Sequence, residues 1–172
     1  MSTKPSDFDS ALHLLPAPVT IIGARRGDEL GGLTAAWVTR VSLAPPLLLV
    51  AIGHDRRTWE LLQEAGEFTV SVLREDQIGA ARLFGLKSRR DIDKWAQTEH
   101  VLLGDGVPAV ADCAAHYLCR LVSRFVTGDH DCLVGEIISA ETIAGGPALP
   151  MRGRDYAPRP AEENENGGGN GA

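Results

Sequence analysis

The chain has 172 residues, enough for one domain with a real core, and 44% of them are hydrophobic while only 5% are aromatic. Its formal net charge of −6 argues against nucleic acid or an anionic membrane as the main partner. No apolar run approaches the ~18 residues of a membrane span, and the polar N-terminal segment lacks the apolar stretch of a signal peptide. We therefore expect a cytoplasmic protein.

The cysteines and histidines do not form a metal-binding pattern. The three cysteines are widely spaced and include no C-x-x-C pair, so in a reducing compartment they are expected to be buried thiols. The five histidines lack the spacings typical of zinc sites. His116 and Cys119 are three residues apart, but in a strand they would point to opposite faces. We expect no metal site.

The first half of the chain alternates strand patterns with breaks and contains one clear helix. That helix has Thr58 as its expected N-cap and Gly66 as its stop. The short apolar run Leu47–Ile52 is typical of a strand buried on both faces. The patterns predict helices over 5–15 and 58–65 and strands over 19–25, 33–42, 47–52 and 67–73.

The second half begins with helical patterns and returns to strands. A basic loop, Lys87–Arg90, separates two predicted helices. Because strands and helices do not alternate regularly, the order favours a closed or sandwiched β architecture over a doubly wound sheet. Pro, Glu, Asn and Gly dominate from Pro158 onward, which predicts a disordered tail. The patterns predict helices over 76–83 and 91–97 and strands over 99–103, 109–112, 115–126 and 131–143.

The segment Gly53–Thr58 joins a predicted strand to a helix start and contains Arg56 and Arg57. Free backbone N–H groups at a helix start, the helix dipole, a threonine hydroxyl and a guanidinium together suit an anion. The alternative is a solvated arginine pair ahead of an ordinary capped helix. The residues alone leave both interpretations open.

Two further segments could contact a ligand. In Gly31–Thr39, glycines followed by small residues would let a ligand lie against the backbone, with Thr34 and Thr39 as hydrogen-bond donors. A hairpin turn followed by an ordinary strand would give the same pattern. The turn Thr127–Asp131 carries His130, which could contact a phosphate, an amide or a proton in transfer. Turn histidines without such a role are also common.

Several well-known motifs are missing from the sequence. It has no G-x-G-x-x-G opening a helix after a strand and no G-x-x-x-x-G-K-[ST] loop. It also has no G-x-S-x-G elbow and no H-E-x-x-H pair. These absences argue against a Rossmann dinucleotide site, a phosphate-binding P-loop, a hydrolase nucleophile elbow and a zinc protease site.

Taken in order, the segments resemble the FMN-binding split-barrel flavin reductase family, over about residues 11–156. The strongest stretch, 32–52, reads small-Thr-Ala, a strand, Ser-x-x-Pro-Pro-Leu and a second strand. It is followed by Arg56-Arg-Thr58 and the helix, and Gly128-Asp-His130 falls where the family would place it. The family includes reductase components of two-component flavin monooxygenases, some ferric reductases and flavoredoxin.

The resemblance implies a mainly β fold, a split β-barrel of the Greek-key, FMN-binding type with six strands and inserted helices. It implies a domain over 1–157, with the acidic, Gly-rich tail over 158–172, and a homodimer with the flavin near its interface. The implied activity is NAD(P)H-dependent flavin reduction, in which NADH or NADPH gives a hydride to FMN or FAD. Reduced flavin would then pass electrons to a partner monooxygenase component or to ferric iron.

The resemblance also implies roles for individual residues, position by position. Around the isoalloxazine ring it places Thr34, Ala35, Ala36 and Trp37, with Thr39 and Ser42 nearby. Beneath the ring and ribityl chain it places Ala51, Ile52 and Gly53, and on the phosphate Arg56, Arg57 and Thr58. Phe84 and Gly85 would flank the flavin. His130 would meet the nicotinamide or help to supply a proton, and the loop Lys87–Arg90 could attract nucleotide phosphates.

Trp37 departs from the pattern of many flavin reductases, which have a smaller residue there. A large ring at this position is similar to the flavoredoxin and ferric reductase branch and could restrict nicotinamide stacking. The sequence therefore keeps open a non-enzymatic, flavoredoxin-like FMN-binding electron carrier. A split barrel that binds haem or another ligand is a third interpretation, and the C-terminal segment 150–156 matches the family only loosely.

Overall fold

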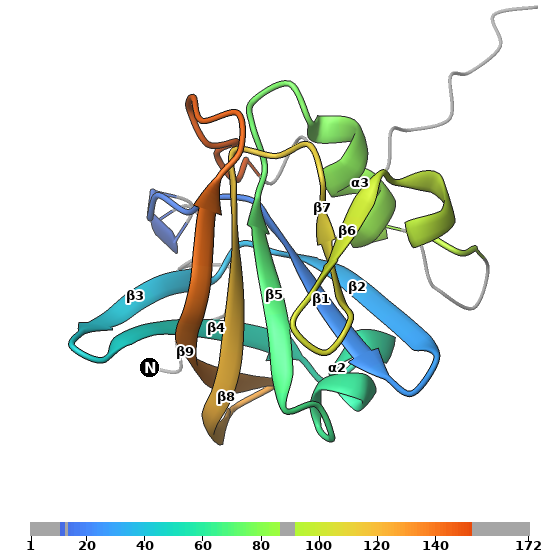
Figure 1. Cartoon of the computed structure of the whole chain (residues 1–172). Coiled ribbons are helices and arrows are strands. Elements are labelled where there is room, and N and C mark those ends of the chain that lie inside the picture. The colour runs from blue at the N-terminus through green and yellow to red at the C-terminus, as the bar shows by residue number, and fades with distance from the viewer. Residues whose placement is uncertain (1–10, 13, 87–91, 153–172) are drawn as a thin grey trace, which may run out of the picture.

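Antiparallel strands dominate the computed structural model, which describes residues 11–12, 14–86 and 92–152 (Figure 1). The helices are α2 (Arg57–Leu62), α3 (Ile78–Leu86) and the single 3-10 turn η1 (Trp95–Gln97). The strands are β1 (Thr20–Arg26), β2 (Glu29–Ala35), β3 (Val38–Leu43), β4 (Pro46–Gly53), β5 (Glu67–Val72), β6 (His100–Leu103), β7 (Val107–Val110), β8 (Ala115–Thr127) and β9 (His130–Thr142).

The large sheet has the order β2-β1-β5-β8-β9-β4-β3, and the hairpin β6-β7 lies apart from it. Its two end strands, β2 and β3, are separated in the chain only by Ala36 and Trp37. Since β2 pairs with β1 while β3 pairs with β4, the two are halves of one bent strand that closes the sheet. Counted this way the barrel has six strands, and the expected mainly β barrel with inserted helices is confirmed.

The bend also corrects the sequence interpretation, because residues 33–42 do not form one uninterrupted strand but the end of β2 and most of β3. At Ala36 and Trp37 the chain leaves one neighbour and joins another. Val38 N donates to Ala36 O, and Ala51 N from β4 donates to Trp37 O. Local propensity gives no sign of such a change of partner, which only the closed sheet imposes.

Two hydrophobic clusters hold the barrel and its covering layer together. Inside the barrel, Phe68 of β5 and Leu133 of β9 pack in one cluster with Leu61 of α2. A second cluster places Ile21 of β1 with Phe84 of α3 and Trp95 of η1. Strand β1 contributes to both clusters, so it is buried on both faces. The second cluster packs α3 and η1 against β1.

Strand β4 does not have the two buried faces that its apolar sequence predicts. Leu48, Val50 and Ile52 are buried, whereas the residues between them, such as Ala51, are only partly covered. The apolar residues of the second face are therefore available to a ligand or to another chain. This correction bears directly on the candidate site.

The helices differ from prediction mainly at their ends. Helix α2 has Arg56, not Thr58, as its N-cap, and no side chain caps it; Thr58 is 3% exposed and packs inward instead. The predicted helix 91–97 is only the 3-10 turn η1, with residue 91 outside the described part. Most of the predicted helix 5–15, the loop Lys87–Arg90 and the tail 158–172 also lie outside the described residues.

Within residues 11–12, 14–86 and 92–152, no helix has the length and apolar character that crossing a membrane would require. The three cysteines, Cys113, Cys119 and Cys132, are all buried and unpaired, as the sequence predicts.

Candidate functional site

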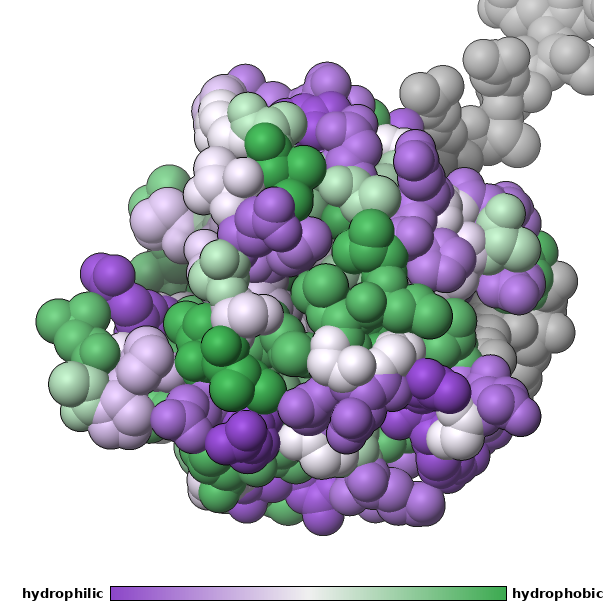
Figure 2. Space-filling model, in the orientation of Figure 1, coloured by the Kyte–Doolittle hydropathy of each residue, from purple (hydrophilic) through white to green (hydrophobic). Residues whose placement is uncertain are grey.

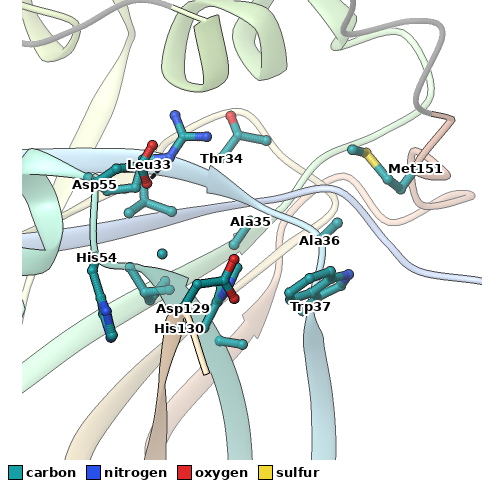
Figure 3. Close-up of a pocket in the computed structure, with 14 residues that line it drawn as sticks. Leu33, Thr34, Ala35, Ala36, Trp37, His54, Asp55, Asp129, His130 and Met151 are labelled. Carbon is teal, nitrogen blue, oxygen red and sulfur yellow. Dashed lines mark hydrogen bonds and ion pairs between the residues drawn. The ribbon is translucent and has the colours of Figure 1, made fainter. Parts of the chain in front are cut away.

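A cavity of about 670 Å³ opens where the bent strand β2–β3, the end of β4 and the β8–β9 turn meet (Figure 3). This volume lies within the ~300–1,000 Å³ range of small-molecule sites. We call it the ring cavity. Its walls are formed by Leu33, Thr34, Ala35, Ala36, Trp37, Ala51, Ile52, Gly53, His54, Asp55, Arg56, Asp129, His130 and Met151.

One wall of the ring cavity is the end of β2, whose side chains are small. Thr34 and Ala35 close β2, and Ala36 follows at the bend. The Thr34 hydroxyl donates to Ala81 O of α3 at 2.7 Å. Because the hydroxyl hydrogen is engaged in this bond, the hydroxyl can only accept a hydrogen bond from a ligand. This differs from the expected role of Thr34 as a donor.

The opposite wall carries an imidazole held by two neighbours. His130 Nδ1 lies 2.7 Å from Asp129 Oδ1, and its ring centroid lies 4.6 Å from that of Trp37. This hydrogen bond holds the pKa of Asp129 below its ordinary value. A β-carbon built on Gly53 would lie 3.6 Å from His130 Nε2, so this nitrogen faces the chain segment that ends β4. The ring is thus fixed in orientation at the cavity wall.

A smaller cavity of about 170 Å³ adjoins the first, and the two share Leu33, Asp55 and Arg56. We call it the anion cavity because basic groups line it. Arg56 Nη1 donates to Gly85 O at 3.2 Å. The complete lining is Gly32, Leu33, Asp55, Arg56, Arg57, Thr58, Phe84, Gly85, Leu86 and Lys94.

Lys94 is a buried cation at the anion cavity. It is 6% exposed, and its Nζ donates to Phe84 O at 3.0 Å and to Gly32 O at 3.4 Å. Burial, together with the nearby Arg56 charge, lowers the pKa of Lys94 to about 8. An ammonium has three N–H donors, so one remains beyond these two bonds. Sequence reasoning missed this residue, because a single lysine inside a predicted helix carries no motif.

The donor set of the anion cavity fits a phosphate group. Arg56 and Lys94 bring two positive charges, and Thr58 brings a hydroxyl. Arg57 lines the same cavity, and its guanidinium pairs with Glu60 and, at 3.3 Å, with Glu29. Arg56 Nε lies 3.4 Å from Oδ1 of Asp55, which also lines the cavity. The structure thus places the predicted anion-binding segment Gly53–Thr58 at a cavity. Lys94, a cation that the sequence analysis did not predict, lines the same cavity.

The structure brings most of the expected site residues to these two cavities. Phe84 and Gly85 lie at the anion cavity, where Phe84 packs edge-on against Trp95 with centroids 4.7 Å apart. Thr39 and Ser42 lie on β3 and line neither cavity. Besides Lys94, sequence reasoning gave no individual role to several lining residues, namely His54, Asp55, Asp129 and Met151 at the ring cavity, Gly32 and Leu86 at the anion cavity, and Leu33 at both.

Comparison with known proteins gives several related chains. A flavin reductase (NADH) of Kitasatospora aureofaciens is 36% identical over 91% of this chain and 83% of its own. The reductase component of 4-hydroxyphenylacetate 3-monooxygenase of Thermus thermophilus is 33% identical over 87% of this chain and 93% of its own. An uncharacterized protein of Archaeoglobus fulgidus is 41% identical over 110 residues, and the match spans 62% of its length.

Among solved structures, the NADH:FAD oxidoreductase of Streptomyces globisporus in complex with NAD and FAD fragments superposes with a TM-score of 0.79. It is 29% identical, with 96% of this chain and 99% of that chain covered. The family model described as "Flavin reductase like domain" matches residues 12–158, which include both cavities. The chain therefore belongs to the flavin reductase like domain family.

Proposed function

We propose that this chain is an NAD(P)H-dependent flavin reductase that uses FMN or FAD. The observation that carries the proposal is the pair of adjoining cavities, one walled by small residues and one lined by Arg56 and Lys94. Together they match a planar ring with a phosphate at the end of a short chain. The relatives named as NADH-using flavin reductases support the same activity.

Each cavity has a distinct task in this proposal. Arg56, Lys94 and Thr58 bind the flavin phosphate, while the small residues Ala35 and Ala36 let the ring approach the backbone. A bound flavin supplies the redox chemistry by accepting a hydride from NADH or NADPH. His130, held by Asp129 and packed on Trp37, contacts the nicotinamide or holds a proton at Nε2.

We further propose that the electrons leave with reduced flavin, for a partner monooxygenase component or for a ferric complex. The Thermus thermophilus relative, named as the reductase component of a monooxygenase, supports the first acceptor. We also propose that the chain forms a homodimer and works in the cytoplasm. Its three buried, unpaired cysteines support a reducing compartment.

A flavin-binding electron carrier without NAD(P)H turnover is the second candidate, and Trp37 is the observation that favours it. This side chain is 61% exposed at the cavity wall, beside the imidazole that would meet the nicotinamide. A large ring in that place could keep the nicotinamide from stacking on the flavin.

The absorption spectrum of gel-filtered protein, recorded before and after anaerobic addition of NADH, tests both candidates. We expect flavin bands, after loading with FMN if necessary, that bleach rapidly with NADH. Bands that persist with NADH and NADPH but bleach with dithionite would establish the carrier instead. A protein that binds neither FMN nor FAD would refute the proposed function.

A further inference from the structure

Asp131 is a buried carboxylate with polar partners from three other parts of the chain. It is 3% exposed and directly follows His130 in β9. Trp59 Nε1 of α2 donates to Asp131 Oδ2 at 2.8 Å, and His54 Nε2 lies 3.0 Å from Asp131 Oδ1. Arg124 Nε of β8 lies 3.9 Å from the same carboxylate. Neither the expected site residues nor the proposed catalytic roles use this group.

The two donors to Asp131 stand on either side of the segment that lines the anion cavity. His54 precedes Asp55–Thr58 and Trp59 follows it, so one carboxylate joins both ends of this phosphate loop. The loop is also tied through its backbone, because His54 N donates to Asp129 O at 3.3 Å. Asp131 therefore links the loop that bears Arg56 to the turn that bears His130.

The protonation states follow from the geometry. Burial pushes the pKa of Asp131 upward, but the hydrogen bonds from Trp59 and His54 hold it below its ordinary value. An ionised carboxylate only accepts hydrogen bonds, so His54 must donate through Nε2–H. It does so both as the neutral ring and as the imidazolium, so the contact survives either state of His54. The other charged groups nearby are Arg124, which faces Asp131, and Asp129, which faces His54.

We propose that Asp131 is a positioning residue that fixes the phosphate loop against the His130 turn, and that its negative charge makes this link insensitive to the protonation of His54. The inference rests on the proposed function, since it assigns the loop to the flavin phosphate. It goes further by predicting how the affinity for FMN responds to pH when the carboxylate is replaced by an amide.

Asp131→Asn replaces the carboxylate with an amide of nearly the same shape, so it isolates the effect of the negative charge. Trp59 can only donate, so it occupies the amide oxygen and leaves the NH₂ group facing His54 Nε2. Neutral His54 can turn to the other tautomer and accept from that NH₂, whereas the imidazolium cannot. Protonation of His54, which low pH favours, should therefore break the link in this variant.

The experiment measures dissociation constants for FMN and riboflavin by flavin fluorescence between pH 5.5 and 8.5, in wild type and variant. The variant-to-wild-type ratio cancels the titration of Lys94 and of the phosphate itself. For FMN we expect a ratio within about threefold at pH 8 that rises by about tenfold at pH 5.5. For riboflavin, which has no phosphate, the ratio should stay near one at every pH.

Two matched controls isolate the imidazole. His54→Gln replaces it with an amide that does not titrate and can still donate, so this variant should keep a flat ratio. Asp131→Asn combined with His54→Gln should lose the rise at low pH. Trp59→Phe removes one donor and retains an aromatic side chain. It should weaken FMN binding about threefold to tenfold without a pH trend, and it tests the proposal independently if Asp131→Asn does not fold.

A pH-independent ratio for Asp131→Asn, or equal losses for FMN and riboflavin, would overturn the inference, as would unchanged FMN binding in Trp59→Phe. Wild-type protein that binds no flavin would refute the proposed function itself, and the inference with it. The two failures are therefore distinguishable in one set of titrations.

Discussion

At the scale of single residues, Lys94 shows a cost in stability that a ligand would offset. Its ammonium is buried, and within the described part of the chain its hydrogen bonds go to backbone carbonyls rather than to a carboxylate. Burying a charge without a counter-charge is unfavourable. A phosphate in the anion cavity would supply the missing negative charge, which explains why such a residue is tolerated.

Lys94→Met should therefore weaken FMN binding more than riboflavin binding. Losing one charge-assisted contact to phosphate predicts an increase of about 10-fold to 100-fold in the FMN dissociation constant. Fluorescence titrations with both flavins check this. Arg120→Gln, which alters an exposed arginine paired at 3.9 Å with Glu136, is the matched control. Equal losses for both flavins would contradict a phosphate contact.

The same substitution should stabilise the flavin-free protein at neutral pH. Because burial lowers the pKa of Lys94 from 10.5 to about 8, the unfolded chain binds more protons between these values. The free energy of unfolding of wild type should then rise as the pH increases from about 8 to 10.5. Lys94→Met should lose this rise and gain about 1 to 3 kcal/mol at pH 7, as measured by urea unfolding. A variant less stable than wild type at pH 7 would show that the carbonyl hydrogen bonds outweigh the burial of charge.

His130→Ala tests the other cavity. The imidazole lies against Trp37 and is held by Asp129, so its loss should disturb the nicotinamide more than the flavin. We expect a higher apparent KM for NADH, or slower turnover, by about tenfold, with FMN affinity within about twofold of wild type. Steady-state kinetics and FMN titration separate the two effects. A change in flavin loading alone would reassign His130 to the cofactor.

At the scale of elements, the sequence predicts most strands to within a few residues, because alternation and turn residues are local signals. It does not predict the bend at Ala36 and Trp37 or the partly covered face of β4, since both depend on which strands become neighbours. In the candidate site, the sequence predicts the Gly53–Thr58 segment because its residues form a local pattern. Lys94 reaches the same cavity only through the packing of η1, which no local pattern encodes.

The β8–β9 turn offers a prediction at this scale. Gly128 has a φ of +63°, a conformation that other residues adopt only with strain. Gly128→Ala should lower the free energy of unfolding by about 1 kcal/mol and raise the apparent KM for NADH, because His130 lies two residues later. Gly79→Ala is the control, because in helix α3 no described residue outside the helix's own backbone lies within 4 Å of the new methyl group. If both variants behave alike, the turn conformation is not what places His130.

At the scale of the whole molecule, a row of apolar side chains runs outward from the ring cavity to an exposed phenylalanine. Ala51 of β4 pairs with Cys132 of β9, which pairs with Phe125 of β8. Directly paired residues of antiparallel strands share one face of a sheet, so this row crosses from the cavity wall to Phe125, which is 46% exposed. On the neighbouring β3–β4 hairpin Leu43 is 75% exposed, and Figure 2 shows hydrophobic atoms at the hairpin tip, at the left edge.

The proposed homodimer would cover these surfaces, and Phe125→Glu tests whether its interface lies there. A charge placed in a desolvated apolar contact should shift the protein from dimer to monomer in sedimentation velocity, by at least about tenfold in the dimer dissociation constant. Val101→Glu on β6, in the separate hairpin, changes a similarly apolar residue of 38% exposure and should leave the dimer intact. If a second copy of the chain completes the ring cavity, the affinity for FMN should fall as the dimer dissociates. Dilution of the wild-type protein should show the same fall. A wild-type monomer with full FMN affinity would refute the dimer, and a Phe125→Glu dimer would place its interface elsewhere.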